Sequence, residues 1–121
     1  MSRLGDLVGE VRGSIEGAAV ALVVGLDGMV VAGSGESTIA SSWDVLAAHY
    51  VEILRRAREA SREAKTEPPG EVMISSTSGT TLLRSLAEGY ALLVVLHAGA
   101  IVGKARYDLR RAAARILPEI V

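Results

Sequence analysis

Apolar residues recur every three or four positions at the start of the chain, with acidic and basic side chains between them. This first stripe consists of Leu4, Leu7, Val8, Val11 and Ile15. Such a period predicts a short amphipathic helix with one buried side. The next two apolar runs, residues 18–25 and 29–32, flank an Asp27-Gly28 pair. An Asp-Gly pair between two β-rich runs predicts a hairpin, because both turn positions tolerate positive φ.

A long helix is predicted between two clusters of helix-breaking residues. Ser41 and Asp44 are spaced like a capping box at its start, and it ends near Lys65, before Pro68 and Pro69. Its apolar positions occupy closer to one half than to one third of the helix circumference. One face of a sheet cannot easily bury a stripe of that width. These positions are Trp43, Leu46, Ala47, Tyr50, Ile53, Leu54, Ala57, Ala60 and Ala64.

Three further strands are predicted at residues 71–77, 80–87 and 90–96, and a closing helix at about 98–117. The order is α-β-β-α-β-β-β-α, within a single domain spanning residues 1–121. One five-stranded antiparallel sheet with helices on both faces, a profilin-like α+β fold, would cover every apolar surface. The runs at 18–24 and 90–96 are apolar on both faces and so belong in the middle. This favours the strand order 2-1-5-4-3, with the strand at residues 29–32 on an open edge.

Composition and charge narrow the classes of partner. The formal net charge is −1 and there are no cysteines. No basic field attracts nucleic acid or an anionic membrane, and no disulfide framework is possible. The longest apolar runs fall well short of the ~20 residues of a spanning helix, and the N-terminus is no secretion signal. We therefore expect a cytoplasmic protein.

Candidate catalytic and metal-binding residues are few. The two histidines, His49 and His97, are distant from each other in the sequence, and carboxylates are not clustered at ligand spacing. Gly28 and Gly33 have the spacing of a phosphate-binding loop, but Ser34 stands where that loop requires lysine. These glycines are better interpreted as turn residues. We expect no enzyme activity, no metal and no cofactor.

Two features instead predict a second copy of the chain. The edge strand at residues 29–32 has no charge, proline or polar face, and such edges invite pairing. The wide apolar stripe of the long helix must also be buried. A twofold dimer that joins two edge strands would bury both features. The predicted interface consists of Met29, Val30, Val31, Ala32, Trp43, Tyr50 and Leu54.

Two segments resemble the roadblock/dynein-light-chain family. They are ALVVGLDGMVVA at residues 21–32 and, more specifically, GAIVGKARYDLRRAA at residues 99–113. The resemblance implies the same element order, an edge-to-edge homodimer, and service as regulator or scaffold for Ras-like small GTPases. It also implies that bacterial relatives pair with gliding-motility GTPases and stimulate hydrolysis without supplying a catalytic arginine.

On that interpretation, twin long helices would form a platform that biases a GTPase toward one nucleotide state. The candidate contact residues project away from the apolar stripe: Glu52, Arg55, Arg56, Glu59 and Arg62. The alternatives for this face are an arginine finger or an ordinary solvated surface with i,i+4 ion pairs. For the whole protein they are a pure assembly scaffold or a small-ligand sensor, although the aliphatic core offers few convergent polar groups.

Overall fold

One antiparallel sheet of five strands forms the centre of the molecule, in the order β2-β1-β5-β4-β3. The computed structural model describes residues 3–36, 42–87 and 89–120. The strands are β1 (Ala18–Gly25), β2 (Val30–Gly35), β3 (Glu71–Ser76), β4 (Gly79–Ser85) and β5 (Tyr90–His97). All four strand pairs are antiparallel. The predicted fold class and strand order are confirmed.

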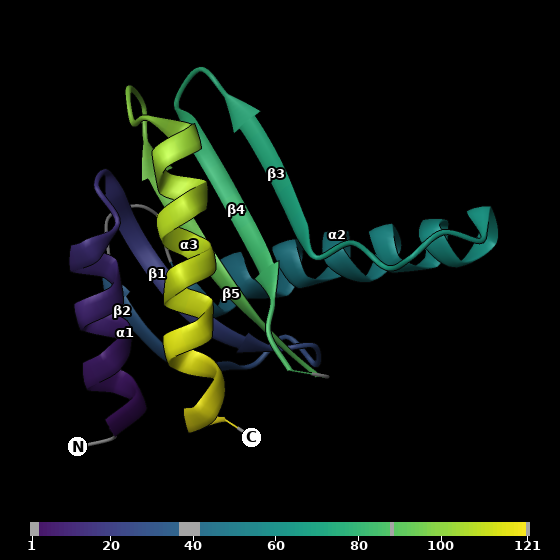
Figure 1. Cartoon of the computed structure of the whole chain (residues 1–121), viewed down its shortest axis with the longest axis horizontal. Coiled ribbons are helices and arrows are strands. Elements are labelled where there is room, and N and C mark those ends of the chain that lie inside the picture. Colours follow the sequence, from purple (N-terminus) through teal and green to yellow (C-terminus); the bar gives the residue numbers. More distant parts are fainter. Residues whose placement is uncertain (1–2, 37–41, 88, 121) are drawn as a thin grey trace.

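Helices cover the sheet on both faces (Figure 1). Helices α1 (Arg3–Ser14) and α3 (Val102–Ile116) pack on one face, and α2 (Trp43–Ala64) packs on the other. A 3₁₀ turn, η1 (Leu117–Glu119), follows α3. Along β1, Ala21 and Val23 face α1 and α3, whereas Leu22 and Val24 face α2. Successive side chains of a strand alternate between faces, so an all-apolar strand fills two cores at once.

The N-cap of helix α2 lies one residue later than predicted. The hydroxyl of Ser42 accepts a hydrogen bond from the backbone N–H of Asp44 at 3.1 Å. Ser42 is therefore the N-cap, and the prediction of a capping box from Ser41 is wrong; Ser41 itself lies outside the described residues. The helix ends as predicted, with Lys65 in the left-handed conformation (φ 58°) and its N–H bonded to Arg62.

Two predicted boundaries are wrong by three residues or more. Strand β2 continues to Gly35, because Gly33 and Ser34 pair with Leu22 and Ala21 of β1 rather than ending the strand. Helix α3 begins at Val102 and not near residue 98. Gly99 has a φ of 88°, a conformation that closes a turn after β5 and cannot continue a right-handed helix.

Gly33 allows α2 to approach the sheet closely. A methyl group at this position would lie 2.6 Å from Cδ2 of Leu22 and 2.8 Å from Cζ3 of Trp43. Both contacts are far inside van der Waals distance. The indole of Trp43, the first residue of α2, therefore packs over bare backbone at β2.

We predict that Gly33→Ala lowers the free energy of unfolding by about 1–3 kcal/mol, because the added methyl group overpacks this contact. Gly103→Ala is the matched control, since nothing lies within 4 Å of a methyl group there and alanine favours the helix by about 0.5–1 kcal/mol. Urea denaturation measures both. Equal stability of the Gly33→Ala variant and the wild type would show that Trp43 does not pack as described.

Candidate protein-interaction surfaces

Helix α2 is longer than the sheet that it covers. Its buried residues are Ala47, Val51 and Leu54, and none of its residues after Leu54 is buried. Figure 1 shows the C-terminal half of α2 projecting beyond the edge formed by β3. This projecting half is stabilised by the helix itself and by few contacts with the rest of the chain, which leaves most of its surface accessible.

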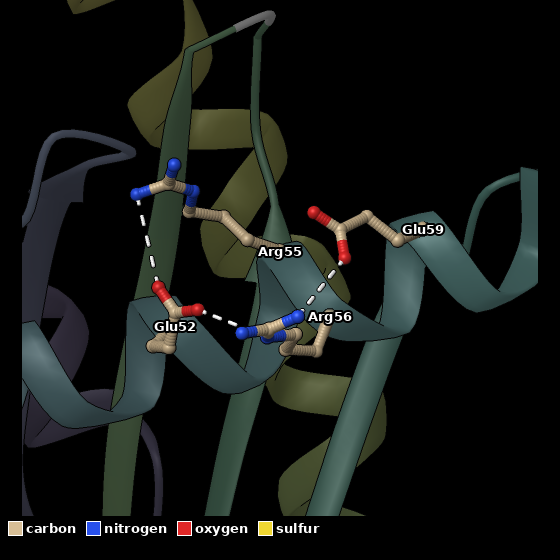
Figure 2. Close-up of polar contacts among 4 residues, drawn as sticks. All are labelled: Glu52, Arg55, Arg56 and Glu59. Carbon is tan, nitrogen blue, oxygen red and sulfur yellow. Dashed lines mark hydrogen bonds and ion pairs between the residues drawn. The ribbon is translucent and has the colours of Figure 1, made fainter.

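The outward side of α2 carries a row of ion pairs (Figure 2). Glu52 contacts Arg56 at 3.1 Å and Arg55 at 3.8 Å, and Arg56 also contacts Glu59 at 3.5 Å. All four side chains are more than half exposed. The predicted residues Glu52, Arg55, Arg56 and Glu59 therefore lie together, and we call them the charged row.

Exposed helical pairs of this kind contribute only about 0.3–0.5 kcal/mol each to stability. The charged row is thus a minor part of what holds the fold together. Arg62, the fifth predicted contact residue, is also exposed but forms no ion pair within the described part of the chain. It lies beside a cavity between α2 and the segment that leads into β3.

The residues predicted for the dimer interface fall into two groups. Val30, Val31 and Ala32 lie on the edge strand β2, as predicted, while Met29 lies in the turn before it. Val31 is 48% exposed and Met29 is also exposed. Val30 and Ala32 are half-buried and pack against the core of their own chain.

The three predicted residues on α2 are engaged within the chain. Trp43 packs on Gly33, and the hydroxyl of Tyr50 accepts a hydrogen bond from Thr81 Oγ1 at 3.4 Å. Leu54 is 0% exposed, because it points directly at the sheet. Leu54 therefore has no exposed surface to offer a second copy, and it is left out of the interface proposed below.

A second open edge, β3, was not predicted as an interface. Met73 at its centre is 49% exposed. The pairing of β3 with β4 runs without a register shift, whereas β2 pairs with β1 across a shift between Val23 and Val24. Irregular pairing is one device that protects an edge from further strands. The regular strand β3 is the less protected edge.

An apolar flank of α2 adjoins this edge. Val45 and Ile53 are 51% and 41% exposed, and Ala57, Ala60 and Ala64 continue the same side of the helix. Beside this flank, a groove of about 350 Å³ lies between α2 and the strands β3 to β5. Leu46, Tyr50, Ile74 and Val95 are among its lining residues. The sequence indicated this apolar flank through the width of the apolar stripe, to which Val45 and Ile53 belong.

The described residues offer little else for chemistry. They contain no group of three or more His, Asp or Glu side chains that could hold a metal ion. His49 is exposed on α2, and His97 lies 3.5 Å from Glu36 at the end of β2. None of the helices in the described residues combines the length and the apolar character that a transmembrane span requires.

Comparisons with known structures agree with this architecture. MglB from Myxococcus xanthus superposes with a TM-score of 0.87 at 10% identity, covering 95% of this chain and 85% of that chain. Acanthamoeba castellanii profilin IA superposes with a TM-score of 0.64 at 15% identity, covering 95% and 97% of the two chains. These likenesses show the fold, including its predicted profilin-like character. The comparison with curated protein sequences finds no match.

Two findings show the family. MglC from Myxococcus xanthus is 32% identical, with a TM-score of 0.67, and the match covers 95% of this chain and 97% of that chain. The model of the Roadblock/LC7 domain matches residues 5–97. This match includes the predicted segment 21–32 but ends before the segment 99–113. The chain belongs to the Roadblock/LC7 family.

Proposed function

We propose that this protein is a homodimeric regulator or scaffold that binds a Ras-like small GTPase and biases its nucleotide state. Membership of the Roadblock/LC7 family supports the class of partner. The observation that carries the proposal is the projecting half of α2, which presents a charged row outward and an apolar flank sideways. A helix that only covered its own sheet would need neither feature.

The dimer interface that we propose is the β3 edge, in place of the predicted β2 edge. A twofold axis at the centre of β3 would pair Met73 with the same strand of the second copy. Each projecting α2 would then extend over the sheet of the other copy, where the groove beside Leu46 and Ile74 lies. Its apolar flank, from Ile53 to Ala64, would pack against the partner helix.

This arrangement leaves the charged row free for a third protein. The two α2 helices would lie side by side on one face of a ten-stranded sheet, with both rows facing solvent. Arg56 is already held between Glu52 and Glu59. An arginine finger would have to leave both carboxylates, whereas an allosteric contact uses the charged row as it stands. We therefore propose an allosteric effect, in which the platform holds the switch region of the GTPase in one conformation.

The oligomeric state tests the first part of the proposal. Sedimentation at low micromolar concentration should give about twice 12.6 kDa. Met73→Lys should shift the protein to a monomer, because a charge at the centre of a pairing edge opposes association. Val31→Lys is the matched control: it places the same charge on the other open edge and should leave the dimer intact.

Circular dichroism should show both variants folded, since each residue is about half exposed. A monomer with Val31→Lys and a dimer with Met73→Lys would place the interface on β2, as the sequence first predicted. A wild-type monomer would contradict both versions of the dimer.

The charged row is tested by reversing two of its residues. Arg55→Glu together with Arg56→Glu should abolish binding to a GTPase partner, because interface hot spots contribute about 2 kcal/mol or more each. The free energy of unfolding should fall by no more than about 1 kcal/mol, since only exposed helical pairs change. Dimerisation should persist. Pulldown and calorimetry with the small GTPases of the same cell, loaded with GDP or a GTP analogue, measure the effect.

The matched control is Arg110→Glu with Arg111→Glu, the same change at two adjacent exposed positions of α3. It should leave GTPase binding unchanged, because α3 lies on the opposite face of the sheet. If the α3 variant loses the partner and the α2 variant keeps it, the protein is a scaffold that works through its basic α3 surface.

The purified protein alone should hydrolyse no GTP.

A further inference from the structure

One cavity lies beneath the projecting half of α2, between the helix and the segment that leads into β3. Its volume is about 470 Å³, within the range of small-ligand sites. Helix α2, the segment between α2 and β3, and the last residue of β4 form its walls. The lining residues are Arg58, Ser61, Arg62, Thr66, Pro68, Pro69, Gly70 and Ser85. They include no aspartate or glutamate among the described residues.

Arg58 is anchored at this cavity with hydrogen-bonding capacity unused. Its Nη2 donates to Ser85 Oγ at 3.1 Å, and Ser85 is itself fixed, since its Oγ donates to the carbonyl of Pro69 at 3.3 Å. The Nε of Arg58 is buried yet has no acceptor among the described residues. Burying a charged donor without an acceptor is unfavourable, so an anion placed beside this guanidinium would offset an unmet charge.

The other polar groups of the cavity do not provide an acceptor for Arg58. The hydroxyl of Ser61 donates to the carbonyl of Ala57, and that of Thr66 donates to the carbonyl of Ser61. Arg62 brings a second guanidinium that forms no ion pair within the described part of the chain. The cavity therefore has two positive charges and apolar walls from two prolines.

We propose that this cavity is an oxyanion-binding pocket, in which Arg58 and Arg62 hold a carboxylate or phosphate group while Pro68 and Pro69 contact the group's apolar stem. A planar guanidinium matches both anions with paired hydrogen bonds. The anion comes either from a free small molecule or from an acidic side chain of a protein. This pocket goes beyond the proposed function, and it requires neither the GTPase nor the dimer.

NMR of the arginine Nε–H groups tests the proposal. The full-length protein is titrated with inorganic phosphate, and in parallel with a short peptide that carries two glutamates, at ionic strength matched with sodium chloride. The Nε–H resonance of Arg58 should shift and saturate with at least one probe, while that of Arg55 does not. Saturation by phosphate alone identifies the free-anion source, and tighter binding of the peptide identifies the protein source.

Arg58→Met should weaken binding of the effective probe by roughly tenfold or more, as expected for loss of a charged hydrogen bond. Arg62→Gln should weaken it too; this side chain is exposed, so the variant tests the pocket even if Arg58→Met does not fold. Arg55→Gln, on the same helix but outside the pocket, should bind as the wild type does. The proposal is overturned if neither probe shifts Arg58, or if Arg55→Gln weakens binding as much as the pocket variants.

Discussion

The two central strands, β1 and β5, are apolar on both faces, and this requirement for cover on two sides determines the rest of the architecture. Seven of the eight residues of β1 are buried, so neither of its faces can meet solvent. One face has two helices, α1 and α3, whose buried residues form a continuous core with the sheet. The other face has α2 alone. A single helix cannot cover five strands, and the uncovered remainder is the groove beside β3, β4 and β5.

The sequence predicted the strand order because the order depends on burial and on short connections between consecutive strands. Two all-apolar runs had to be neighbours in the middle, and short connections fixed the other three strands. The boundaries depend on forces that a hydrophobic pattern does not record. β2 continues through Gly33 and Gly35 because β1 offers hydrogen-bonding partners there, not because glycine favours a strand. Helix α3 starts late because Gly99 closes a turn, although the alanines on either side of it favour a helix.

The interaction surfaces were predicted less completely, for a related reason. The charged row followed from helical spacing, since residues three and four apart on a helix are neighbours in any fold. Leu54 belonged to the same wide stripe as Ile53, yet one is fully buried and the other is 41% exposed. Only the position of α2 on the sheet decides between them. The β3 edge that we propose as the interface was not predicted, because Glu71, Ser75 and Ser76 make the strand polar in the sequence, whereas Met73 at its centre is 49% exposed.

On the proposed function, helix α2 divides its surface among three tasks at different angles. Ala47, Val51 and Leu54 bind it to its own sheet, and the flank from Ile53 to Ala64 is available to a second copy. The charged row remains outermost. Because its pairs are weak and solvent-exposed, an approaching protein can exchange them for its own charges at little cost. A row with two positive charges between two negative charges favours partners with the complementary order of charges, and it repels those in the wrong register. Weak internal pairing is therefore what makes this surface suitable for reversible and selective binding.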